Sequence, residues 1–69
     1  MRDPKLDPRP GDVLAKTSKA GKKIERHVVE VDGYDIWYTD GKKTDRHLCF
    51  ISTWMQWARA AEVVTRGEG

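Results

Sequence analysis

The sequence has a single cysteine and no long hydrophobic run, and both absences restrict where the chain can work. Cys49 has no second cysteine with which to form a disulfide, and a secreted domain of this size usually needs several. No apolar stretch approaches the roughly 18 residues of a membrane span, and none follows Met1 as a signal peptide would require. We therefore expect a cytoplasmic protein that does not enter a membrane.

The sequence also has no large excess of positive or negative charge, and it lacks the common catalytic motifs. The 13 basic and 11 acidic residues give a formal net charge of only +2, too small a bias to indicate a nucleic-acid binder by itself. The chain lacks nucleophile-elbow, HExxH, Walker and Rossmann patterns, and a chain of 69 residues leaves little room for a water-excluding cleft. We expect no enzyme and no cofactor, but a small binding module.

The length fits one domain, and hydrophobic residues at 38% with three Trp, two Tyr and one Phe are too many for a disordered chain. All three prolines lie in residues 1–10, which predicts an extended arm with Leu6 as its anchor. We expect one domain over residues 11–66 and a frayed end at 67–69. Its predicted strands cover residues 13–15, 23–31, 34–39, 46–51 and 62–65.

Residues 52–61 have a helical period. Trp54, Trp57, Ala58 and Ala61 form an apolar stripe, and both tryptophans are expected in the core. Thr53 with Gln56 fits a capping box. Four meander strands, a short helix and a closing strand resemble, in their order, a small SH3-like barrel of about five antiparallel strands.

Short segments also resemble small uncharacterised proteins encoded by bacteriophages and prophages. These segments are Pro10-Gly11-Asp12-Val13-Leu14, Val31-Asp32-Gly33, Cys49-Phe50-Ile51-Ser52-Thr53-Trp54 and Trp57-Ala58. The resemblance implies an accessory protein of phage type and carries no catalytic residue with it.

The register of the strands follows from one turn and one internal repeat. Asp32-Gly33 predicts a type I′ hairpin that pairs Val31 with Tyr34 and puts every second residue on one face. Residues 21–28 recur at 41–48, which puts the fourth strand in the same phase as the second. The expected inner face then has His27, Val29, Val31, Tyr34, Ile36, Tyr38, His47, Cys49 and Ile51. The expected outer face has Arg26, Val28, Trp37, Arg46, Leu48 and Phe50. A loop one residue longer or shorter before residue 46 would turn Leu48 and Phe50 inward.

The meander separates the charges. The first and third loops lie at one end with Lys16 and Lys19, and Glu30, Asp32 and Asp35 lie at the other end. Clustered cations beside an exposed indole favour nucleic acid, DNA or RNA, because they release counterions and offer a surface for base stacking. The residues predicted to bind it are Lys22, Lys23, Arg26, Trp37, Lys42, Lys43 and Arg46.

A second hypothesis uses the same outer surface. Val28, Trp37, Leu48 and Phe50 would form an apolar patch, which is typical of a contact with a protein partner or a second copy of the chain. A metal site is not expected, because His27, His47 and Cys49 are only three candidate ligands without CxxC or HxxxH spacing.

Overall fold

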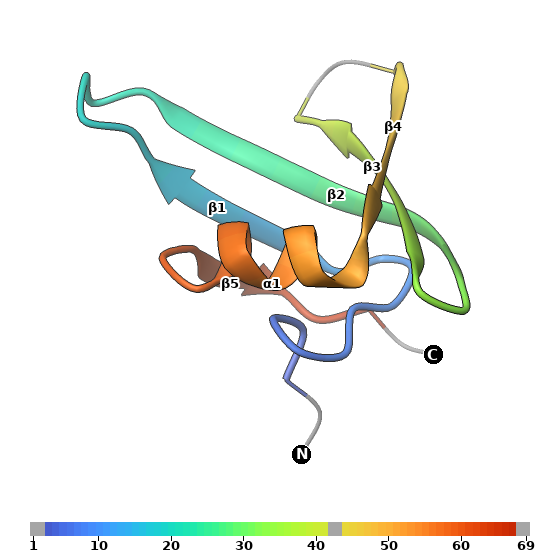
Figure 1. The fold of residues 1–69 in the computed structure, drawn as a ribbon. Coiled ribbons are helices and arrows are strands. Elements are labelled where there is room, and N and C mark those ends of the chain that lie inside the picture. The colour runs from blue at the N-terminus through green and yellow to red at the C-terminus, as the bar shows by residue number, and fades with distance from the viewer. Residues whose placement is uncertain (1–2, 42–43, 68–69) are drawn as a thin grey trace.

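The structure, a computed structural model, describes residues 3–41 and 44–67 (Figure 1). The described residues form β1 (Val13–Thr17), β2 (Lys23–Asp32), β3 (Asp35–Asp40), β4 (Arg46–Phe50), α1 (Ile51–Ala58) and β5 (Glu62–Thr65). The predicted mainly β class is confirmed, with five antiparallel strands and one short helix before the last strand.

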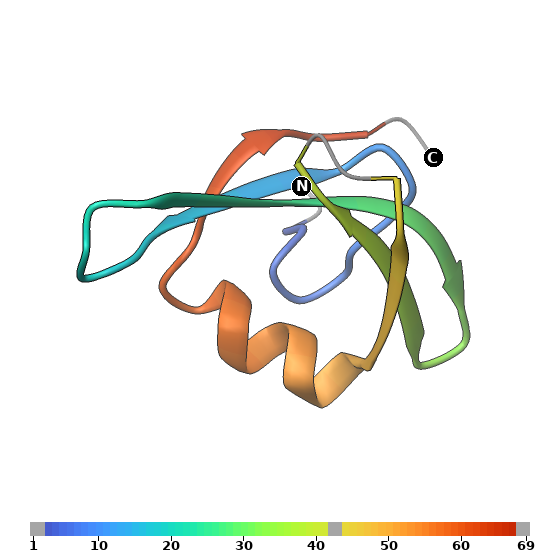
Figure 2. The ribbon, with the colours of Figure 1, turned by 90° about the horizontal axis from the view of Figure 1, so that it is seen from above.

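All five strands belong to one sheet with the order β4-β3-β2-β1-β5. The long strand β2 pairs with β1 through residues 23–27 and with β3 through residues 26–32. Figure 2 shows β2 curving between these two partners. The sheet does not close, because β4 and β5 stand at its two edges.

The turn between β2 and β3 lies one residue later than the sequence predicts. Asp32 pairs with Asp35, so Gly33 and Tyr34 are the two loop residues. Gly33 has φ +60°, and Tyr34 does not have a positive φ. A positive φ at the first loop position alone fits a type II′ turn, so the predicted type I′ turn is wrong in position and type.

A β-bulge at Val29 decides which side chains of β2 face the core. The β2–β3 register shifts between Val28, which pairs with Tyr38, and Glu30, which pairs with Trp37. The extra residue inverts the first half of β2 relative to β3. Val28 is therefore 2% exposed and Val29 36% exposed, so the outward face predicted for Val28 is wrong.

The core lies between the inner face of the sheet and α1 (Figure 2). Trp54 is fully buried, as is Ala58 one turn later, and Trp57 packs against them half-buried. The predicted core position is confirmed for Trp54, whereas Trp57 packs at the edge of the core. The buried cluster consists of Leu14, Val28, Ile36, Trp54, Ala58 and Ala61.

The helix begins directly where β4 ends. Phe50 is its N-cap residue, without a side-chain cap, so the predicted capping box of Thr53 and Gln56 is wrong. The Ile51 N–H instead donates to the Tyr34 carbonyl oxygen at 2.8 Å. A carbonyl of the β2–β3 turn thus accepts a hydrogen bond from one of the N–H groups that a helix start leaves free, in place of a side-chain cap.

The N-terminal arm is folded rather than extended. The N–H groups of Leu6 and Asp7 both donate to the Asp3 carbonyl oxygen, at 3.0 and 2.8 Å. The buried Trp54 Nε1 donates to the Pro4 carbonyl oxygen at 3.1 Å. Pro4 is buried whereas Leu6 is 61% exposed, so Pro4 rather than Leu6 anchors the arm.

The two ends of the described chain meet at Asp12, which is fully buried. Its carboxylate accepts hydrogen bonds from the Arg9 N–H at 2.7 Å and from the Gly67 N–H at 2.6 Å. Gly67 lies so close that a Cβ there would overlap the Pro10 carbonyl oxygen and the Gly11 backbone. Gly67 is therefore held in place, contrary to the predicted fraying of this position.

Candidate functional site

The β1–β2 hairpin has an ordered, lysine-rich tip that projects beyond the rest of the sheet (Figures 1 and 2). The Ser18 N–H donates to the Lys22 carbonyl oxygen, the Gly21 N–H donates to the Ser18 carbonyl oxygen, and the Lys22 N–H donates to Ser18 Oγ. Gly21 has φ +82°, a value that L side chains rarely adopt. We call Lys16, Lys19, Lys22 and Lys23 the basic hairpin.

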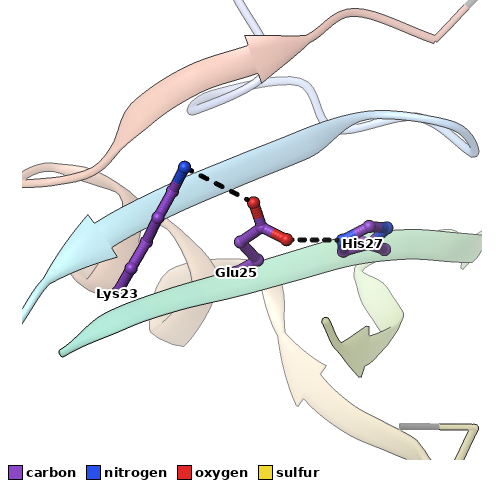
Figure 3. Close-up of polar contacts among 3 residues, drawn as sticks. All are labelled: Lys23, Glu25 and His27. Carbon is purple, nitrogen blue, oxygen red and sulfur yellow. Dashed lines mark hydrogen bonds and ion pairs between the residues drawn. The ribbon is translucent and has the colours of Figure 1, made fainter. Parts of the chain in front are cut away.

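Two carboxylates lie near these lysines. Glu62, at the start of β5, lines a hollow together with Lys16 and Lys23, and Glu25 forms an ion pair with Lys23. Glu25 lies between Lys23 and His27 on one face of β2, with Glu25 Oε2 3.7 Å from Lys23 Nζ and Oε1 3.4 Å from His27 Nε2 (Figure 3). Among the described residues, no ion pair joins Lys16, Lys19 or Lys22 to a carboxylate. Lys19, Lys22 and Lys23 are exposed, and Lys16 is half-buried. The basic hairpin therefore keeps most of its positive charge available to solvent.

The loop after β3 begins further back along β2 than the hairpin tip does. The Gly41 N–H donates to the Glu25 carbonyl oxygen at 3.1 Å, and β3 pairs with β2 only from Arg26 onward. The hairpin tip thus extends past the end of β3 (Figure 1). Lys42 and Lys43, which were predicted to join the basic cluster, lie outside the described residues, and Arg46 is exposed at the start of β4.

Arg26 faces the inner side of the sheet rather than the outer surface. Its guanidinium carbon lies 4.5 Å from the centre of the Tyr38 ring and 4.3 Å from that of Trp57. The Val29 bulge is the reason, since it places Arg26 in phase with Val28 and Tyr38. The predicted position of Arg26 beside Trp37 is wrong.

The outer face of β3 and β4 is apolar and partly exposed. Trp37 is half-buried, with Leu48 as its cross-strand neighbour on one side and Glu30 on the other. Leu48 is 52% and Phe50 53% exposed, which confirms their predicted position on the outer face. Tyr34, 69% exposed, has its ring 5.9 Å from that of Phe50. We call Tyr34, Trp37, Leu48 and Phe50 the outer patch. Compared with the predicted apolar patch, it includes Tyr34 and lacks Val28, which is buried.

The opposite, inner side of β3 and β4 carries a titratable cluster. Burial raises the pKa of the Cys49 thiol above its ordinary value of 9.0, while the Arg26 cation acts in the opposite direction. Burial likewise raises the pKa of Tyr38 above 10.0. His47 lies 3.3 Å from Asp40 and stacks near Tyr38, with ring centroids 5.5 Å apart. His27 points to the other face, so the predicted place of His27 near Tyr38 is wrong.

The described residues offer no group of three or more metal-ligating side chains. An open hollow of about 430 Å³ is lined by Lys23, Ile24, Glu25, Arg26, Asp40 and Gly41. Its charged groups nearly balance, and it opens broadly to solvent beside the basic hairpin. The hollow is thus an open depression on the surface, with Arg26 as part of its lining.

No family model, curated protein or solved structure matches this chain. None of the helices in the described part of the chain is long and apolar enough to span a membrane.

Proposed function

We propose that this protein is a non-enzymatic binding module that holds polyanions, DNA or RNA without strong sequence preference, through the basic hairpin. The observation that carries the proposal is the placement of Lys16, Lys19, Lys22 and Lys23 on one projecting, ordered hairpin. Lysines that neutralise phosphates release condensed counterions, which supplies most of the affinity in sequence-independent binding.

The rest of the charge distribution supports the same proposal. Glu30, Asp32 and Asp35 lie at the far end of β2 and β3, so they do not compete with phosphates at the hairpin. The tip is held by its own backbone hydrogen bonds, so little ordering of the chain opposes binding.

The proposal omits three of the described residues that the sequence favours, namely Arg26, Trp37 and Arg46. Arg26 is engaged by Tyr38 and Trp57, and Trp37 lies beside Glu30, whose negative charge disfavours an approaching phosphate. In their place it includes Lys16 and Lys19 together with the predicted Lys22 and Lys23. Arg46 belongs to another surface.

We extend the proposal to the fold family and the setting. The strand order β4-β3-β2-β1-β5, the bulged and curved β2 and the helix before β5 support an SH3-like, partly open barrel. A phage-type accessory role rests on the sequence resemblance alone. A cytoplasmic location rests on the single Cys49.

Fluorescence anisotropy with a labelled single-stranded oligonucleotide at low salt tests the binding. The double variant Lys19→Gln with Lys22→Gln removes two charges from the hairpin and should weaken binding about tenfold or more. The matched control, Arg59→Gln with Arg66→Gln, removes the same charge elsewhere on exposed positions and should change affinity much less. No binding at low salt, or equal loss in both variants, would overturn the proposal.

A further inference from the structure

The free edge of β4 is open for pairing with another strand. β4 stands at one end of the sheet order and pairs only with β3 among the described strands. The Ile51 N–H bonds to the Tyr34 carbonyl, next to the pair of Phe50 with Asp35. Hydrogen-bonded and non-hydrogen-bonded pairs alternate in an antiparallel ladder, so the Leu48–Trp37 pair is non-hydrogen-bonded. The N–H and C=O of Leu48 therefore point away from β3.

This edge has little of the usual protection against pairing. Proteins guard exposed edge strands with charged side chains, lysine above all, with proline, with a bulge or with inward-pointing charges, and here Arg46 supplies such a charge only at the start of β4. Residues 46–50 contain neither lysine nor proline, and their register with β3 has no shift. Leu48 and Phe50 instead expose more than half of their surface on the outer side. An apolar, regular and open edge of this kind is typical of a strand that another strand covers.

The charges along the edge indicate which strand fits. Arg46 begins β4 on the outer face. At the other end of β4, Phe50 pairs with Asp35, which in turn pairs with Asp32. If a second copy of β4 pairs antiparallel with Leu48 opposite Leu48, Arg46 of each copy lies opposite Phe50 of the other copy. Asp35 lies next to that Phe50, on β3. A parallel alignment would instead put Arg46 beside Arg46.

We infer that two copies of this chain form a twofold dimer by antiparallel pairing of β4 with β4. Leu48 lies opposite Leu48 of the second copy, and their outward N–H and C=O groups bond to one another. The two outer patches join into one apolar strip on the same side of a ten-stranded sheet (five strands from each copy). Two Arg46–Asp35 contacts flank this strip, one at each end. This dimer does not depend on polyanion binding, which uses the β1–β2 hairpin and not β4.

Sedimentation velocity of the full chain over a wide range of concentration, at low salt and without nucleic acid, tests the dimer. The expected species has twice the 7.9 kDa mass of one chain. Leu48→Lys puts two like charges opposite each other and should abolish the dimer, while circular dichroism stays unchanged because Leu48 is half-exposed. The matched control is Val64→Lys on the other edge strand, β5, where Val64 is also 52% exposed; it should leave the dimer intact.

Charge reversal tests the antiparallel alignment. Arg46→Asp alone and Asp35→Arg alone should each weaken the dimer about tenfold, and the double variant should restore it, because the opposite charges meet again. A chain that stays monomeric at all concentrations would overturn the dimer. Dimers that survive Leu48→Lys, or that Val64→Lys disrupts instead, would overturn the assignment to β4, and failure of the double variant to rescue would overturn the antiparallel register.

Discussion

The guanidinium carbon of Arg26 lies 4.3 Å from the centre of the Trp57 ring, on the side of the sheet that α1 covers. The Tyr38 ring flanks the same guanidinium at 4.5 Å. Arg26 thus lies at the edge of a small core, where its aliphatic chain and planar guanidinium group cover the Tyr38 and Trp57 rings. The Arg26 Nε atom is buried without a hydrogen-bond partner among the described residues, so the ring contacts account for its placement.

Replacing Arg26 should destabilise the fold. We expect Arg26→Ala to lower the free energy of unfolding by about 2 kcal/mol, because a desolvated cation–π contact contributes about that much. Arg26→Lys should recover less than half of the loss, since an ammonium group cannot stack as a plane. Urea denaturation measures both. The exposed Arg59→Ala serves as control, with an expected change below about 0.5 kcal/mol; equal losses for Arg26→Ala and Arg59→Ala would contradict the stacking account.

The N-terminal arm should contribute to stability through Pro4. Trp54→Phe removes the donor to the Pro4 carbonyl and some buried volume, with an expected loss of about 2 kcal/mol. In a chain that lacks residues 1–5, the same substitution should cost clearly less, because the acceptor is gone. Thermal or urea unfolding of the four proteins gives this coupling. Leu6→Ala should have little effect because Leu6 is 61% exposed; a larger loss for Leu6→Ala than for Trp54→Phe would contradict the anchor.

Asp12 and Gly67 should act together in fastening the chain ends. Asp12→Ala leaves the N–H groups of Arg9 and Gly67 without this acceptor, and we expect a loss of about 2–4 kcal/mol. Gly67→Ala should cost about 1–3 kcal/mol through overlap with the Pro10 and Gly11 backbone. Amide hydrogen exchange should show β5 losing protection first in both variants. Asp45→Ala, at an exposed position, is the control.

Stability should fall at alkaline pH. Burial raises the pKa of Cys49 above 9.0 and that of Tyr38 above 10.0 in the folded chain. Well below pH 9 both groups keep their protons in the folded and in the unfolded chain, so neither group lowers the free energy of unfolding. As the pH rises further, the unfolded chain loses these protons first, and the free energy of unfolding decreases. Urea midpoints between pH 7 and 11 measure the decrease, which the Cys49→Ala and Tyr38→Phe variants should each make shallower. An equal slope in the variants would contradict the assignment to these groups.

The sequence predicts the order of the strands and the helix well because hydrophobic periodicity is a local signal, although the β2–β3 turn lies one residue later than predicted. The strand at residues 62–65 and the phase of Leu48 and Phe50 agree with the structure. The bulge at Val29 was not predictable, because Val28 and Val29 are both apolar and the pattern does not choose between them. That one extra residue moves Val28 and Arg26 to the inner face, and with them the predicted site.

Contacts between segments that are distant in the chain could not be predicted from the sequence either. Pro4 meets Trp54 and Asp12 meets Gly67 across at least 50 residues, and no spacing rule connects such pairs. The N–H of Ile51 donates to Tyr34 in the β2–β3 turn, a contact between distant segments that takes the place of a side-chain cap. Tyr34 joined the outer patch only through the displaced turn.

The salt dependence of oligonucleotide binding tests the proposed function most directly. Four lysines that each neutralise one phosphate of a single strand predict a slope of log affinity against log salt near −3, from roughly −0.7 per phosphate. Lys19→Gln with Lys22→Gln should reduce that slope to about half, while Trp37→Phe should leave it unchanged. A slope near zero, or a slope that depends on Trp37 and not on these lysines, would contradict binding through the basic hairpin.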